Sequence, residues 1–356
     1  MDKTIFDLYT DFLLSSVGPA TATNLSRLVD GAISHDQITR LLAGEPKRSA
    51  HLWQKVKPLV RAVESPDGVI VVDDSVSEKP YTDENELICW HWNYTENRPV
   101  KGINFLTAFY QVGTVGLPVA FDLVTKTETY LDPKTGQEKR RSTTSKNERF
   151  RMLLRISVQN EIQFSYVLAD LWYASADNMV LVVRELKKHF VFPLKHNRKV
   201  ALGEADQKEG RFVAVETLDL PAGQPLEIWL EDVPFALLLT KEVFTNKDGS
   251  QGVRYLVTDD LTLTYDQIVK LYKRRWSVEV YHESLKQNAS LEKSPTRTET
   301  TQRNHFFASL CAYIKLESLK IKTGVNHFAL KSKIYLSALK AAYQELVKLE
   351  PISLGA

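Results

Sequence analysis

The sequence predicts an α/β protein, in which a mixed sheet with flanking helices is interrupted by a β-rich insertion and preceded by an all-helical region. Short β-branched runs of the buried-strand type alternate with helical segments after residue 68, which indicates the mixed sheet. The order of patterns predicts four segments: helical residues 1–65, the first part of the sheet in 66–190, the β-rich insertion in 191–258, and a mostly helical part in 259–356.

Composition excludes several classes of protein. No apolar run is long enough to span a bilayer and the first residues lack the pattern of a secretory signal, so we expect a cytoplasmic protein. Cys89 and Cys311 form neither a disulfide framework nor a zinc pattern. The net charge is only +2, but residues 134–151 are locally basic. Such a cluster suits a phosphate backbone, and a solvated loop is the alternative.

The all-helical region contains a pattern typical of a helix-turn-helix. Residues 21–44 hold two short amphipathic helices, and Gly31 suits the left-handed end of the first. Ser34 and Gln37 predict a capping box that opens the second helix. This spacing would present Gln37 and Arg40 to a DNA groove, although small helical bundles share the same pattern.

Two predicted strands end in carboxylates. The run "VIVVDDS" reads as a buried strand that closes with Asp73 and Asp74, and "FSYVLAD" reads as another that closes with Asp170. Between them we expect an antiparallel hairpin over residues 102–124 and a helix over residues 146–159. Strand ends in α/β sheets are where ligand sites gather, so these carboxylates are candidate site residues.

The stretch "LYKRRWSVEVYHESLKQ", residues 271–287, predicts a helix with an unusual polar face. At about 100° per residue, Tyr272, Arg275, Glu279 and Lys286 fall within roughly 60° of one another. An exposed, solvated face with an i,i+4 pair of Arg275 and Glu279 is the ordinary alternative. A functional site becomes the better interpretation when further carboxylates end separate strands.

The three carboxylate positions together indicate a metal site. Asp74 (or Asp73), Asp170 and Glu279 offer oxygen ligands without a Cys or His companion, which suits Mg²⁺ or Mn²⁺. Such a site can hold two ions about 3.5–4 Å apart and promote phosphoryl transfer. The neighbouring cations on the helix would then bind the phosphates.

This order of elements resembles the DDE transposases of bacterial insertion sequences, which have an RNase H-like core. The helix matches the signature of one branch, which reads Tyr, two residues, Arg, three residues, Glu, six residues, Lys; here these are Tyr272, Arg275, Glu279 and Lys286. "VVDDS" and "ADLWYAS" are similar to the two aspartate blocks of the family. The resemblance covers the chain from about Val69 onward.

The resemblance implies a set of catalytic, metal-binding residues, namely Asp74, Asp170 and Glu279, with two Mg²⁺ or Mn²⁺ ions as cofactors. Asp73 is the open alternative for the first ligand, because adjacent residues of a strand point to opposite faces. We expect Asp74 because relatives follow the catalytic aspartate with a small hydroxyl residue, here Ser75.

The resemblance also implies DNA contacts. Tyr272, Arg275 and Lys286 would bind phosphates near the transposon end. Trp276 follows the arginine at a position where relatives stack an extruded base, with ordinary packing as the alternative.

The implied function is cut-and-paste transposition at the nucleoid. The protein would bind double-stranded DNA at the ends of its element as a homodimer, nick it hydrolytically and join the 3′-hydroxyl to target DNA. A hairpin intermediate is implied by the resemblance alone. The alternatives are a metal-dependent nuclease with the same core, and a domesticated DNA-binding regulator.

Overall fold

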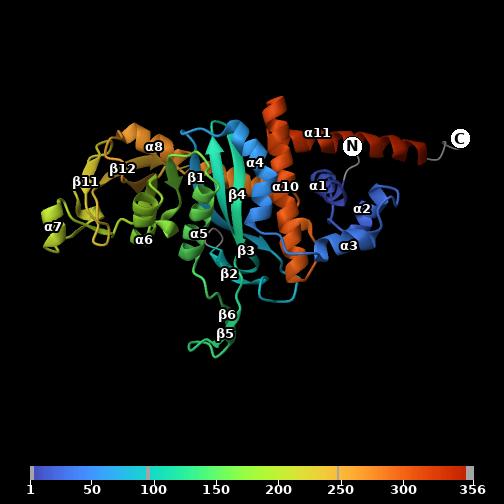
Figure 1. Ribbon diagram of the computed structural model, residues 1–356, viewed down its shortest axis with the longest axis horizontal. Coiled ribbons are helices and arrows are strands. Elements are labelled where there is room, and N and C mark those ends of the chain that lie inside the picture. The colour runs from blue at the N-terminus through green and yellow to red at the C-terminus, as the bar shows by residue number, and fades with distance from the viewer. Residues whose placement is uncertain (1–3, 94–96, 247, 350–356) are drawn as a thin grey trace. The chain divides into compact units, whose positions relative to one another are not determined.

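The computed structural model describes residues 4–93, 97–246 and 248–349, and the chain divides into two compact units (Figure 1). The first unit contains residues up to 55, residues 77–103 and residues from 281 onward. The second unit contains residues 56–76 and 104–280, and it holds all of the predicted metal ligands.

A mixed sheet forms the second unit. The order of its strands is β11-β12-β13-β8-β7-β1-β3, and β4 also pairs with β3. β1 pairs in parallel with β7, and β7 pairs in parallel with β8, whereas β13, β12 and β11 add antiparallel pairs. The strands are β1 (Val69–Glu78), β3 (Arg98–Val112), β4 (Val115–Leu123), β7 (Tyr166–Leu168), β8 (His189–Leu194), β11 (Leu226–Ile228), β12 (Leu237–Thr245) and β13 (Gln251–Thr258).

The strand β1 lies inside the sheet, between β7 and β3, and its first residues are wholly apolar. Val69, Ile70, Val71 and Val72 are fully buried, as the β-branched run predicts. The expected end of the strand at the two aspartates is wrong, since β1 continues to Glu78. Its partner β3 is 15 residues long, and beyond Asp73, Ser77 is the one buried residue of β1, so pairing continues where the apolar pattern stops.

The hairpin and the helix expected after β1 are confirmed. β3 and β4 pair antiparallel and are joined at Val112↔Val115, with Gly113 in the left-handed conformation at φ +53°. The helix α5 (Lys146–Gln159) begins with a capping box of Ser145 and Glu148 and packs beside β4 (Figure 1). A local rule of helix capping therefore fixes where this element starts.

A small hairpin separates β4 from α5 and was expected only as a basic segment. It consists of β5 (Glu128–Leu131) and β6 (Glu138–Arg141), and nearly all of its residues are exposed (Figure 1). The buried Arg149 holds its base, because this guanidinium bonds Ser142 Oγ at 3.1 Å and forms an ion pair with Asp122.

The β-rich block expected in residues 191–258 extends the sheet through β8, β13, β12 and β11. Shorter elements fill the connections between strands, and helices follow the block. They are η1 (Leu171–Tyr173), α6 (Ala176–Val180), the π-helical turn η2 (Leu181–Glu185), β9 (Lys199–Val200), α7 (Glu204–Lys208), β10 (Val213–Ala214), η3 (Val215–Thr217), α8 (Tyr265–Lys273) and α9 (Trp276–Gln287).

The single helix expected over residues 271–287 is wrong, because the chain breaks it into α8 and α9. At the junction, the Arg275 N–H bonds the Tyr272 carbonyl and the Val278 N–H bonds the Arg275 carbonyl, each at 3.0 Å. These i→i+3 bonds tighten the turn. The side chain of Arg274 bonds Gln111 and the backbone carbonyl of residue 67, which anchors the junction to the sheet.

The first unit is mainly helical. Gly31 has φ +74°, and both bonds of the Ser34–Gln37 capping box are present. The elements are α1 (Ile5–Ser15), α2 (Ala22–Leu28), α3 (His35–Ala43), the beginning of α4 (Ser49–Val63), β2 (Cys89–Asn93) on the first residues of β3, η4 (Leu291–Lys293), α10 (Glu299–Thr323) and α11 (His327–Leu349).

Buried polar contacts join α1 and α3 to α10. The Tyr9 hydroxyl lies 2.9 Å from His305 Nδ1. Asn304 donates to the carbonyls of Leu42 at 2.9 Å and Gly44 at 3.0 Å. Residues near both ends of the chain therefore share one core. Within the described ranges, no helix has the length and apolar character needed to cross a bilayer.

Candidate active site

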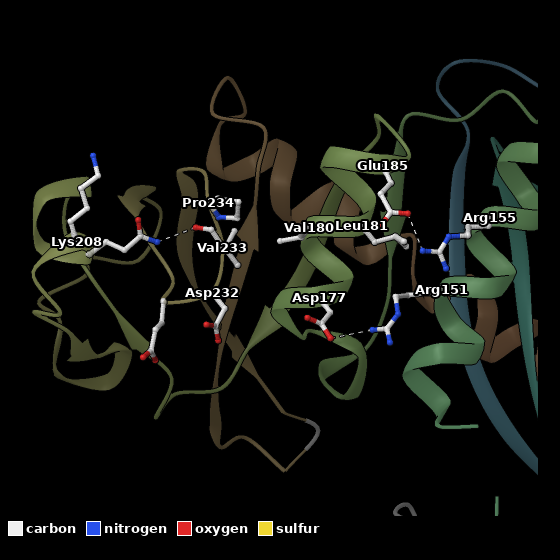
Figure 2. A pocket seen from close by; sticks show the side chains of 12 residues that line it. Arg151, Arg155, Asp177, Val180, Leu181, Glu185, Lys208, Asp232, Val233 and Pro234 are labelled. Atoms are coloured by element: carbon white, nitrogen blue, oxygen red, sulfur yellow. Dashed lines mark hydrogen bonds and ion pairs between the residues drawn. The ribbon is translucent and has the colours of Figure 1, made fainter. Parts of the chain in front are cut away.

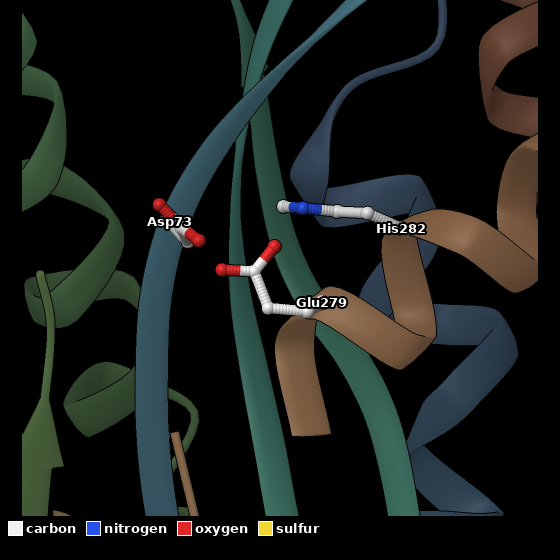
Figure 3. A group of neighbouring side chains, drawn as sticks. All are labelled: Asp73, Glu279 and His282. Carbon is white, nitrogen blue, oxygen red and sulfur yellow. The ribbon is translucent and has the colours of Figure 1, made fainter. Parts of the chain in front are cut away.

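The carboxylates of Asp73 and Glu279 face each other across β1 and α9 (Figure 3). Their oxygens lie within 4.8 Å, close enough to share one cation. Asp73 is 8% exposed, because its side chain points toward the helix side of the sheet. His282 lies one turn further along α9. The structure thus brings Asp73, rather than its neighbour in sequence, next to Glu279.

Asp74 points to the opposite face of β1, and three side chains bind it there. Oδ2 accepts hydrogen bonds from Lys146 Nζ at 2.7 Å and Asn104 Nδ2 at 2.8 Å, and Oδ1 accepts one from the Tyr173 hydroxyl at 2.7 Å. Tyr173 is fully buried and stacks on Phe150 with ring centroids 5.0 Å apart. This carboxylate is therefore held rigidly.

Asp170 follows β7 and caps the short helix η1. Its Oδ1 accepts the Trp172 N–H at 2.9 Å, which fixes the carboxylate at the start of the turn. This capping interaction explains why the chain turns immediately after the strand.

Burial and the neighbouring charges shift the pKa values of the three aspartates in different directions. Burial raises the pKa of Asp73 well above its usual value, and the charges of Asp170, Asp74 and Glu279 raise it further. Burial and the charge of Asp74 also raise the pKa of Asp170. Burial would raise the pKa of Asp74 too, but the charge of Lys146 and the hydrogen bonds from Lys146, Asn104 and Tyr173 outweigh burial and lower that pKa. These donors therefore favour the charged form of Asp74.

Arg275 lies between the facing carboxylates. Its Nη1 is 3.1 Å from Glu279 Oε1 and 3.5 Å from Asp73 Oδ2, and its side chain is 15% exposed. The signature residues Arg275 and Glu279 therefore do form an i,i+4 ion pair. This pair is half-buried, and Arg275 also faces the carboxylate of Asp73. This arrangement differs from the solvated face of the ordinary interpretation.

Tyr272 belongs to α8 and is buried, with 5% of its surface exposed. The guanidinium of Arg254 lies 4.6 Å from the centre of its ring, and Glu242 binds that guanidinium through two hydrogen bonds of 2.6 and 3.1 Å. This side chain, expected at a DNA phosphate, thus packs between the sheet and the helix junction.

The remaining predicted DNA contacts lie in different places. Trp276 is 65% exposed at the start of α9. Lys286, near the end of that helix in the first unit, forms an ion pair of 3.7 Å with Glu292. Gln37 and Arg40 are exposed on α3 of the first unit, where Gln37 also caps its own helix.

Sequence reasoning missed the side chains that bind Asp74. Asn104 reaches it from β3, and no local pattern marks this residue. Tyr173 reaches it from η1 and belongs to the "ADLWYAS" block, but the block does not show that its hydroxyl binds Asp74. Lys146 carried one signal, because it is the first residue of the helix expected over residues 146–159 and lies in the basic segment 134–151. Long-range packing decides these contacts.

A separate cleft of about 760 Å³ lies between α5, α6, η2 and the 231–234 loop (Figure 2). Its lining mixes both signs of charge, with ion pairs between Arg151 and Asp177 at 3.6 Å and between Arg155 and Glu185 at 2.9 Å. None of the predicted site residues lines this cleft. The concave surface and the carboxylate cluster are therefore distinct features.

The donor set of the cluster fits a hard divalent cation. Asp73 and Glu279 supply carboxylate oxygens, which is the ligand chemistry of Mg²⁺ and Mn²⁺. The expected absence of a His companion is wrong, because a ring nitrogen of His282 lies within the same 4.8 Å (Figure 3). Burial, and after it the neighbouring carboxylates, raises the pKa of Asp73 and of Asp170, and a bound cation would favour their charged forms.

The comparisons with known families indicate a nuclease-type enzyme. Residues 3–211 match the family described as DDE superfamily endonuclease, and residues 135–315 match the transposase DDE domain. Each match covers more than half of the chain, so the chain belongs to the DDE superfamily of endonucleases and transposases.

Other comparisons give weaker similarities. No curated protein matches the sequence. Among solved structures, the chain is similar to one described as the Drosophila P element transposase strand transfer complex, with a TM-score of 0.27 and 11% sequence identity. That alignment covers 61% of this chain and 48% of the other, so the chain spans about half the length of that structure.

Proposed function

We propose that the protein is a transposase that binds the ends of its own insertion sequence, of the bacterial type, and catalyses metal-dependent cleavage and strand transfer. The observation that carries this proposal is the pair of facing carboxylates, Asp73 and Glu279, within 4.8 Å and beside Arg275. Family membership supplies the reaction class. The strand-joining step and the end specificity are part of the proposal.

The proposed metal ligands are Asp73, Asp170 and Glu279. Asp73 replaces Asp74 in this set, because Asp74 already accepts three hydrogen bonds on the other face of β1. In this proposal Asp74 is a positioning residue that ties β1 to η1 and α5. The rigid strand then presents Asp73 with little freedom.

Two bound Mg²⁺ or Mn²⁺ ions would supply activation of the attacking oxygen and stabilisation of the leaving one. Arg275 would hold the two facing carboxylates in register and bind a phosphate oxygen with the donors that they leave unused. Trp276 would offer its exposed ring to a base next to the cut, and Lys286 would contact the backbone. In this proposal Tyr272 acts through packing on Arg254.

DNA recognition is proposed for α3. Gln37 and Arg40 are exposed on this helix, and both residue types form bidentate contacts with base edges in the major groove. A homodimer on two paired ends, acting at the nucleoid in the cytoplasm, follows from the proposed reaction, which joins two ends to one target. The rival is a nuclease with the same core, which would cleave DNA without joining it.

The test uses DNA ends taken from the sequences that flank the gene, incubated with full-length protein and Mg²⁺ or Mn²⁺. Glu279→Gln should lose nicking and joining while it keeps end binding, because metal chemistry and recognition use different residues. Glu283→Gln is the matched control, since Glu283 is an exposed carboxylate one turn further along α9. Equal activity in both variants would overturn the proposal, and nicking without joining would favour the nuclease.

A further inference from the structure

A large aromatic side chain is exposed beside the second aspartate of the site. Trp172 is 53% exposed, although its neighbour Tyr173 is fully buried. The exposed ring offers a flat apolar face on which another planar group can stack. The two rings are neighbours on the short helix η1, which directs Tyr173 into the core and Trp172 toward the solvent.

The position of this ring is fixed by the site. The Trp172 N–H donates to Asp170 Oδ1 at 2.9 Å, and Tyr173 is held by Asp74 at 2.7 Å and by stacking on Phe150. The backbone on both sides of the ring is therefore tied to a carboxylate of the cluster. A group that stacks on the indole of Trp172 would therefore lie next to the carboxylates of the site.

A cation accompanies the ring. Lys146 Nζ lies 6.0 Å from the centre of the Trp172 ring, and it binds Asp74 at 2.7 Å. Its side chain is 29% exposed, and an ammonium has three donors, so it can bind Asp74 and a further anion at once. An aromatic face beside an accessible cation matches one nucleotide, which consists of a flat base and a phosphate.

We propose that Trp172 and Lys146 form a subsite for one unpaired nucleotide of the DNA, with the base stacked on the indole and its phosphate bound by the ammonium. The inference rests on the proposed function, because it places this nucleotide beside the scissile phosphate. The subsite lies on the Asp170 side of the cluster, whereas Trp276 belongs to α9. Stacking does not depend on the identity of the base, so the subsite recognises an unstacked strand rather than a sequence.

A double-mutant cycle between protein and DNA tests this contact. The DNA is a labelled duplex with a short single-stranded thymidine overhang, compared with the same duplex carrying abasic sites in the overhang. Binding by full-length protein is titrated in Ca²⁺, so that no cleavage accompanies binding. Trp172→Ala should weaken binding to the thymidine overhang by roughly 5- to 100-fold and leave binding to the abasic overhang nearly unchanged.

Three further variants separate stacking on the ring from other effects on binding. Trp172→Phe retains an aromatic face and should recover most of the lost affinity. Leu171→Ala removes a neighbouring exposed side chain, 41% exposed, and should not distinguish the two overhangs. Lys146→Met should weaken binding to both overhangs and lower the salt dependence of affinity by about one phosphate contact.

The inference fails if Trp172→Ala loses affinity equally for both overhangs, or loses none. The proposed function is measured separately, as Mg²⁺- or Mn²⁺-dependent nicking by the wild-type protein. Nicking without a base-dependent loss would overturn the subsite alone. A base-dependent loss without any nicking would keep the subsite and overturn the transposase.

Discussion

Acidification should destabilise the first unit through one histidine. The His305 Nε2 faces the carbonyls of Ser290 at 3.2 Å and Leu291 at 3.0 Å, and its Nδ1 faces the Tyr9 hydroxyl at 2.9 Å. Carbonyls only accept, so Nε2 carries the proton and Nδ1 accepts from the hydroxyl. A second proton on Nδ1 would force the buried Tyr9 to turn its O–H away from its partner.

The size of the effect follows from the pKa. Burial, with the nearby charge of Lys79, lowers the pKa of His305 from 6.5 to about 3. Below about pH 6.5 His305 becomes protonated in the unfolded chain, whereas in the folded chain it stays neutral until about pH 3. The free energy of unfolding therefore falls as the pH falls through this window. The free energy of unfolding should drop by about 2 kcal/mol between about pH 7 and about pH 5 from this group alone.

The assay is urea unfolding of wild-type protein and His305→Gln at both pH values. The glutamine cannot titrate, so the variant should lose about 2 kcal/mol less than the wild type on acidification, although packing makes it less stable at neutral pH. His35→Gln, at an exposed ring, serves as the control and should follow the wild type. An equal acid loss in His305→Gln and wild type would refute the reasoning.

Two predictions concern DNA. Arg275→Ala and Lys286→Ala should each weaken end binding and reduce the slope of log affinity against log salt by about one, measured by titration across salt concentrations; unchanged slopes would remove both residues from the interface. Gln37→Ala and Arg40→Ala should each cost roughly 1–3 kcal/mol on the cognate end and little on scrambled DNA at fixed salt. Equal losses of affinity for both DNAs would mean that α3 contacts only the DNA backbone.

Capping and turn rules correctly predicted those helices and turns that depend on interactions between residues close in sequence. The capping boxes of Ser34 and Ser145 mark the starts of α3 and α5, and Gly113 marks the turn between β3 and β4. The end of β1 escaped prediction because a long partner strand, rather than its own apolar run, sustains its pairing. The break between α8 and α9 escaped because the bonds of Arg274 to Gln111 join residues that are distant in sequence.

The site was predictable in its residue types but only partly in its geometry. Strand periodicity shows that Asp73 and Asp74 point to opposite faces, yet periodicity does not tell which face meets Glu279. Tyr173 and Lys146, which are distant from Asp74 in sequence, bind the carboxylate of Asp74 on the face away from Glu279. The proposed division at residue 65 remains a prediction, although α1 and α3 share a core with α10.

The most direct test of the central claim compares neighbouring aspartates in a metal-binding titration. Mn²⁺ binding to full-length protein, followed by its effect on water proton relaxation, should be lost in Asp73→Asn and retained in Asp74→Asn. The two variants make the same chemical change one residue apart, and Asp74→Asn keeps an oxygen that can accept from the Tyr173 hydroxyl. Retained Mn²⁺ binding in Asp73→Asn together with loss in Asp74→Asn would contradict the assignment, and retention in both would contradict the carboxylate site itself.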